Sequence, residues 1–180
     1  MDPYRLIDKY YGDLPLLRDI LVKHSEAVAD KALACADSHP ELDIDREFVK
    51  EAALLHDIGI FLTNAPSIEC FGKLPYIAHG IAGELILETE GLPMHARVCA
   101  RHTGAGLTRA DMERQNLPLP RRDMLPETLE EKLVCYADKF FSKSGDLSAE
   151  KPLDKVRRQM AAHGAETAAR FEALHDLFGV

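Results

Sequence analysis

Apolar residues recur with the period of an α-helix along nearly the whole chain, and no other feature restricts the fold as strongly. Between residues 17 and 32, one face repeats at steps of three and four positions: Leu17, Leu21, His24, Val28 and Ala32. The same period continues in segments near residues 48–56, 76–87, 95–102, 129–140 and 153–174. No stretch of strand length alternates apolar and polar residues convincingly. This pattern predicts an all-α helical bundle.

The length of the chain, 180 residues, suits one domain with its own apolar core. We expect a single domain over residues 1–180, with a core from about 14 to 143 and a long C-terminal helix from about 150 to 176. Residues 61–74 and 104–125 form connections that are long for a compact domain, and such loops often carry function. Both are candidates for the mouth of a pocket.

Composition excludes several classes of partner. The formal net charge of −8 argues against a broad surface for extended nucleic acid or anionic lipid. No segment has the apolar length of a membrane span or of a signal peptide, so we expect a cytoplasmic protein without a membrane partner. The four cysteines are far apart and form no CxxC pair, which indicates buried thiols in a reducing compartment. They are Cys35, Cys70, Cys99 and Cys135.

Histidine and aspartate residues stand at the apolar edges or ends of separate helical segments. A single histidine on an apolar face is more often a satisfied core residue than a ligand. The adjacent pair His56-Asp57 is different, because it ends the apolar run AALL and a buried carboxylate needs a metal ion or a basic partner. Together with this pair, the set of candidate ligands comprises His24, His79, His102 and Asp138. Six ligands are too many for one catalytic ion that keeps open positions, but they suit two ions with one carboxylate bridging them.

The order of these residues resembles the HD superfamily of metal-dependent phosphohydrolases. The pattern H…HD…D is matched by His24, His56-Asp57 and Asp138, and the string HDIG at residues 56–59 resembles the HDIG subset. His79 in AHGIAGELIL and His102 in ARHTGAGLT resemble the two-metal branch, which includes the bacterial symmetrical diadenosine tetraphosphate hydrolases. The segment Asp138-Lys139-Phe140-Phe141 differs from these relatives, and two single positions also depart from them. Ile60 stands where many have a lysine, and His102-Thr103-Gly104 is one threonine short of their HTTG.

The resemblance implies a helical bundle with a metal site at its centre. It implies one ion bound by His24, His56, Asp57 and Asp138, and a second bound by Asp57, His79 and His102. The expected cofactors are therefore two divalent transition-metal ions, from among iron, manganese, cobalt, nickel and zinc.

The expected activity is hydrolysis of a phosphate ester or anhydride, most plausibly in a small nucleotide, by a metal-activated water. We assign catalytic roles to Asp57, His79 and His102. Nearby basic side chains are candidates for binding the phosphate, although lysine and arginine are more often simply exposed to solvent. They are Arg101, Lys139, Lys143, Arg121 and Arg122.

Two other functions stay open at this point. Some HD-superfamily members hold two irons with the same ligand set and use dioxygen to cleave C–C or C–P bonds, and ligands alone do not name the metal. A metal-stabilised regulatory domain without turnover is the third interpretation. The remaining histidines, His39, His95, His163 and His175, are interpreted as non-catalytic. The last helix is a candidate surface for a homodimer.

Overall fold

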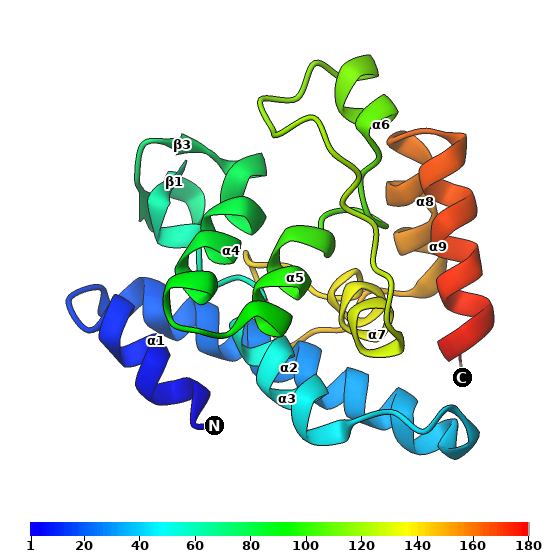
Figure 1. The fold of residues 1–180 in the computed structure, drawn as a ribbon, viewed down its shortest axis with the longest axis horizontal. Coiled ribbons are helices and arrows are strands. Elements are labelled where there is room, and N and C mark those ends of the chain that lie inside the picture. The colour runs from blue at the N-terminus through cyan, green and yellow to red at the C-terminus, as the bar shows by residue number, and fades with distance from the viewer. Residues whose placement is uncertain (180) are drawn as a thin grey trace.

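The longest helix of the computed structural model, which describes residues 1–179, is α2 (Pro15–Ser38). Proline at its first position suits a helix start, because the missing amide hydrogen has no partner there. Helices α3 (Arg46–Leu55) and α7 (Leu129–Asp138) pack against α2, and α4 (His79–Thr89) packs against α5 (Pro93–Arg101). The all-α prediction is confirmed (Figure 1).

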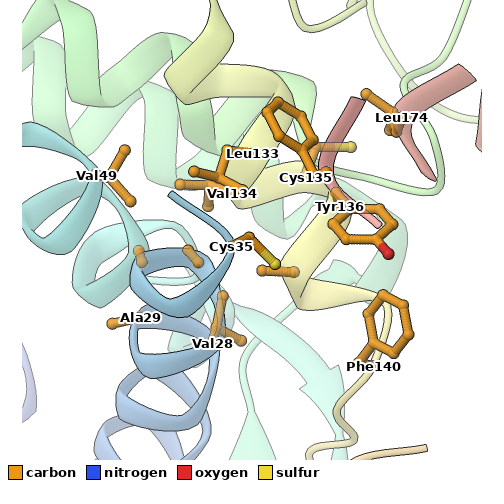
Figure 2. Packing of buried hydrophobic residues seen from close by; sticks show 14 of the residues in the cluster. Val28, Ala29, Cys35, Val49, Leu133, Val134, Cys135, Tyr136, Phe140 and Leu174 are labelled. Carbon is orange, nitrogen blue, oxygen red and sulfur yellow. The ribbon is translucent and has the colours of Figure 1, made fainter. Parts of the chain in front are cut away.

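Two apolar clusters form most of the interior. The first core cluster joins α2, α3 and α7 to the C-terminal helices, and its members include Val28, Val49, Leu133 and Tyr136 (Figure 2). The second core cluster joins α1 (Pro3–Tyr11), the first half of α2, α4 and α5. Ile7 and Tyr11 of α1 are fully buried in it, so the core includes residues before position 14, where we expected it to begin.

The boundary between these clusters runs through the candidate ligands. On α2, Leu21 belongs to the second cluster, Val28 belongs to the first, and His24 lies between them. On α5, Val98 and Cys99 divide in the same way just before His102. The polar side chains therefore lie in the middle of the bundle, where water does not compensate them.

Close backbone contact brings the turn after His56-Asp57 against helix α4. A Cβ atom on Gly59 would overlap the backbone nitrogen of Gly83 and the carbonyl oxygen of His79. Glycine at position 59 therefore lets the HDIG turn touch the first turn of α4, and this contact places His79 next to Asp57. The requirement is steric, since the φ of Gly59 is −86° and any residue adopts that value.

A small sheet occupies part of the connection at residues 61–74, where we expected irregular loop. Strand β1 (Thr63–Ala65) pairs antiparallel with β2 (Cys70–Phe71) and parallel with β3 (Leu74–Pro75), in the order β2-β1-β3. Asn64 lies opposite Phe71, and Thr63 lies opposite Leu74. Strands of two or three residues are too short for an alternating pattern, so the sequence contains no signal for them. Short 3-10 turns adjoin the sheet and two other connections: Pro40–Leu42, Ile60–Leu62, Pro66–Ile68 and Tyr76–Ala78.

The prediction of one long C-terminal helix from about 150 to 176 is wrong. The segment forms two helices, α8 (Leu153–Ala162) and α9 (Ala165–Phe178). The chain breaks at Gly164, whose φ of +122° is incompatible with a continuing right-handed helix. The two helices pack against each other at the side of the molecule reached by α6 (Figure 1).

The connection at residues 104–125, which we name the arm, contains a short helix, α6 (Arg109–Arg114). Thr108 and Asp111 form a reciprocal capping box at its start. Asp111 is buried and also pairs with Arg170 of α9 at 2.7 Å, while Arg170 donates to the carbonyl oxygens of Ala105 and Gly106. These bonds attach the arm to α9. Within residues 1–179, the structure contains no helix long and apolar enough to cross a membrane.

We expect Gly59→Ala to destabilise the fold by about 3 kcal/mol, the upper part of the usual range for overpacking, because backbone atoms of α4 must move. Gly145→Ala is the matched control. Its glycine has a φ of +74° and open space where a Cβ would lie, so it should lose only about 1–2 kcal/mol for the left-handed conformation. Urea denaturation of both variants measures the difference. A cost for Gly59→Ala no larger than that of the control would show that the contact with α4 is not tight.

Candidate metal centre

The structure brings all six predicted ligand side chains together, and most of them come from helix ends. His56 is the C-cap of α3, His79 is the first residue of α4, and His102 is the C-cap of α5. Asp138 is the last residue of α7, whereas His24 lies in the middle of α2. All of them, together with Asp57, are buried, with exposed fractions between 0% and 8%. Helix ends allow this convergence because several segments can point their termini at one place.

Asp57 lies between two groups of ligands. Its Oδ2 atom is 3.0 Å from His56 Nε2 and 3.3 Å from His24 Nε2, and these histidines also face Asp138 Oδ1 at 3.4 and 3.1 Å. Its Oδ1 atom faces the other way, 3.5 Å from His79 Nε2 and 3.4 Å from His102 Nε2. In each group the potential ligand atoms all lie within 4.8 Å of one another. One carboxylate therefore offers a separate oxygen to each group.

Backbone hydrogen bonds orient three of the four imidazole rings. The Nδ1 atoms of His56, His79 and His102 lie 2.6, 2.7 and 2.8 Å from the carbonyl oxygens of residues 53, 76 and 99. A carbonyl oxygen can only accept, so each Nδ1 carries the proton and each Nε2 presents a lone pair to the centre. His24 Nδ1 is the exception, since it is buried with no hydrogen-bond partner among the described residues.

Several atoms at the centre lack the partners that burial requires. His56 Nε2 and both carboxylate oxygens of Asp57 are buried without a hydrogen bond within residues 1–179. The Nε2 atoms of His79 and His102 lie 3.0 Å apart, and both are lone-pair acceptors. Two acceptors at this distance repel each other unless a cation lies near both. The donor set, four imidazoles and two carboxylates, consequently fits metal ions, and Asp57 belongs to both candidate groups.

Charge at the centre is set by burial and by close neighbours. Burial disfavours ionisation of Asp57, but His56 and Lys143 outweigh it and hold the pKa of this carboxyl well below its usual range. Asp138 follows the same pattern through Lys139 and Lys143. Burial lowers the pKa of His79 to about 3. The pKa of His56 is raised to about 9, because the two carboxylates outweigh its burial. The aspartates are therefore anionic and His79 is neutral, as metal ligands must be, whereas His56 holds an Nε2 proton that a bound ion would displace.

Two of the five predicted phosphate-binding residues lie at the centre. Lys143 Nζ is 2.6 Å from Asp57 Oδ2, an ion-pair distance without the geometry of a hydrogen bond. Lys139 Nζ is 2.8 Å from Asp138 Oδ2 and donates to the carbonyl oxygen of His102. Burial opposes the charge of Lys143, but the nearby acids outweigh it and raise its pKa. Each lysine thus neutralises one buried aspartate.

The structure places the three predicted arginines elsewhere. Arg101 pairs with Glu127 and Glu131 at 2.9 and 3.2 Å, and Arg122 pairs with Glu84. Arg121 is exposed on the arm. None of the three lines the cavity at the centre, so their role in substrate binding stays a prediction without support from this arrangement.

A cavity of about 430 Å³ opens onto the ligand cluster. His79, His102, Asp138 and both lysines line its floor, and its walls come from the arm, the 3-10 turn at residues 76–78 and the α8–α9 junction. A larger groove of about 780 Å³ lies between α2 and residues 141–150, but no candidate ligand lines it. The smaller cavity is therefore the one relevant to chemistry.

Sequence analysis missed several side chains of the cavity wall. Tyr76, Gln115 and His163 line it, and His163 had been interpreted only as non-catalytic. The only local signal was the glycine after His163, which marks a helix break. Nothing in the spacing relates residue 163 to residue 79, because folding of the C-terminal hairpin brings them together.

Comparison with known proteins identifies a family and several relatives that this chain matches. The HD domain family matches residues 21–142. A tRNA (cytidine(56)-2'-O)-methyltransferase of Picrophilus torridus is 37% identical over 159 residues, which cover 88% of this chain and 41% of the relative. An uncharacterized protein of Methanocaldococcus jannaschii is 38% identical over 126 residues, covering 68% of this chain and 67% of the relative. The methyltransferase of the same name from Thermoplasma volcanium is 30% identical over 172 residues, covering 92% and 46%.

The chain therefore spans less than half the length of the two methyltransferases that it matches. The names of these relatives do not mention diadenosine tetraphosphate. No solved structure matches the chain.

We expect the wild-type protein to bind two Mn²⁺ ions per chain and His79→Ala to bind one, because this substitution removes a ligand from only one of the two groups. His95→Ala is the matched control, since His95 is buried beside Glu51 and belongs to neither group. Elemental analysis and isothermal titration calorimetry measure the stoichiometry. A single ion in the wild type, or two retained by His79→Ala, would contradict a shared-carboxylate centre.

Proposed function

The chain belongs to the HD domain family, and from this premise we propose that it is a metal-dependent phosphohydrolase that hydrolyses a phosphate ester or anhydride of a small nucleotide. The observation that carries the proposal is the position of Asp57. Its two oxygens face separate ligand groups beside a cavity whose floor also contains two buried lysines. Ligands, open space and cations together are the parts that phosphate hydrolysis requires.

The roles of the ligands follow from the two groups. His24, His56 and Asp138 would hold one ion, His79 and His102 would hold the other, and Asp57 would hold both. Two divalent ions bound there supply a water that ionises near neutral pH and positive charge for the phosphoryl oxygens. The backbone carbonyls that accept from His56, His79 and His102 keep these rings in place.

The two lysines have different roles in this proposal. Lys143 lines the cavity and pairs with Asp57, so its ammonium group lies where a phosphate bound at the floor can contact it. Lys139 donates to the His102 carbonyl oxygen and pairs with Asp138. It therefore positions two ligands, and Lys143 is the residue that binds phosphate. The lysines neutralise the two aspartates, so bound ions would give the floor a net positive charge and attract an anionic substrate to a chain whose net charge is −8.

The names of two relatives provide a second candidate, action on tRNA. The chain matches at least 88% of its own length to proteins named tRNA methyltransferases. Their named activity belongs to proteins more than twice as long as the matched segment, and the acidic balance of this chain disfavours broad contact with a tRNA backbone. We therefore rank hydrolysis of a small nucleotide first and RNA modification second.

The expected result with added Mn²⁺, Co²⁺ or Ni²⁺ is release of inorganic phosphate from members of a nucleotide panel. Asp57→Asn should reduce release to background, because the shared ligand to both ions is lost, whereas His95→Ala should retain it. A colorimetric phosphate assay measures this. Transfer of a methyl group from S-adenosylmethionine to tRNA without phosphate release would favour the second candidate. Two bound irons with oxygen-dependent turnover would favour an oxygenase, and stabilisation by metal without turnover of any substrate would favour a regulatory domain.

Lys143→Met should lower kcat/KM for the same substrate by about 10²-fold or more, the usual loss when one preorganised charge on the reacting group is removed. Methionine keeps the length of the side chain without its charge. Lys132→Met is the matched control for losing a lysine, because Lys132 lies in the first half of α7 and does not line the cavity. Metal content should stay at two ions in both variants. Full activity of Lys143→Met would exclude contact between this lysine and the phosphate.

A further inference from the structure

The mouth of the cavity differs chemically from its floor. The floor is formed by histidines, Asp138 and lysines, whereas the walls above it include Ile77, Leu107 and Leu117. Apolar walls do not suit a phosphate, but they suit a flat ring that follows the phosphate outward. The cavity is thus divided into an anion-binding end and an apolar end.

Two polar side chains at the apolar end have no partner within the protein. Gln115 and His163 line the cavity and are exposed, and the structure gives neither side chain a hydrogen bond within residues 1–179. Each can both donate and accept a hydrogen bond. The edge of a nucleobase presents this mixture of donors and acceptors on a flat ring that also suits the apolar walls, whereas a sugar phosphate has no flat apolar ring.

From this arrangement we infer that the mouth is a nucleobase site, and that Gln115 and His163 determine which nucleoside monophosphate enters. The inference rests on the proposed function, since it places the phosphate at the metal centre. It assigns substrate recognition to residues that carry no catalytic role. His163 lies beyond residues 21–142, the part of the chain that matches the HD domain family, whereas Gln115 lies within it.

Ion pairs hold the segments that carry these two polar residues in place beside each other. Gln115 directly follows α6, whose Arg114 pairs with Glu166 of α9 at 3.1 Å. His163 directly precedes the glycine that begins α9, and Arg170 of α9 pairs with Asp111 of α6. The arm and the C-terminal hairpin are therefore tied to each other beside the cavity. A site held in this way loses less conformational entropy when it binds a ligand.

The size of the cavity favours one nucleoside. Its volume of about 430 Å³ lies in the lower part of the roughly 300–1,000 Å³ range of small-molecule sites. A dinucleoside polyphosphate carries a second nucleoside, which would have to lie outside this volume. The inference therefore assigns a mononucleotide to the site in place of diadenosine tetraphosphate.

The test compares ligands that share a phosphate but differ in the base. Isothermal titration calorimetry of the full chain with AMP, GMP, CMP and UMP is compared with ribose 5-phosphate, which has no base. We expect at least one nucleotide to bind about tenfold tighter than ribose 5-phosphate or more, through stacking and hydrogen bonds to the base. The double variant Gln115→Ala/His163→Ala should bring that nucleotide to the affinity of ribose 5-phosphate. Gln159→Ala, an exposed glutamine on α8 outside the cavity, is the matched control and should change neither affinity.

Three results would overturn the inference: equal affinity for ribose 5-phosphate and every nucleotide, unchanged discrimination in the double variant, or tighter binding of diadenosine tetraphosphate or an RNA oligonucleotide than of any mononucleotide. Absence of nucleotide binding at millimolar concentration counts as the first of these. Because binding is measured without turnover, failure of the nucleobase site is separate from failure of the proposed function, which would appear as no phosphate release from any ester, p-nitrophenyl phosphate included.

Discussion

The buried carboxylate of Asp57 is the constraint around which the rest of the structure is arranged. It is fully excluded from water, ionised, and without a hydrogen bond to either oxygen among the described residues. An isolated charge in such a place would cost more free energy than a fold of this size can supply. Positive charge must lie next to it. Lys143 provides part of it, and the two groups of imidazole nitrogens around the carboxylate are placed to bind cations that provide the rest.

Several ligands can converge on this carboxylate because most of them lie at helix termini. His24 lies in the middle of a helix, so that helix must pass beside the centre. Only a few helices have room to pass beside one point. The other helices point their ends at the centre, and their terminal backbone carbonyls accept the Nδ1 protons of the histidines. The contact of Gly59 with α4 sets how closely two of these ends approach. The packing of a small residue therefore also determines how close the ligands at these helix ends lie to each other.

The candidate ligands and part of the cavity wall come from different parts of the chain. The ligands and Lys139 lie within the segment that matches the HD domain family, together with the arm. The α8–α9 hairpin lies outside that segment, contributes His163 to the cavity wall and is attached to the arm through Arg170 and Asp111. A shared centre with a separately built mouth is consistent with one fold that accepts different substrates.

Periodicity by itself determined the helical fold, because apolar spacing is a local property that packing then uses. It also indicated the six candidate ligands. Burying histidine and aspartate side chains at the apolar ends of helices costs free energy unless a metal ion or another partner compensates them. Three things were decided only by the tertiary structure. Glycine at position 164 permits the break between α8 and α9 without requiring it, and the strands at residues 63–75 depend on backbone pairing that local pattern does not encode. Of the five predicted phosphate-binding residues, only Lys139 and Lys143 reach the centre. Arg101 and Arg122 instead form ion pairs with Glu131 and Glu84. The wall formed by Gln115 and His163 joins segments almost fifty residues apart, and only packing of the arm against α9 brings them to one cavity.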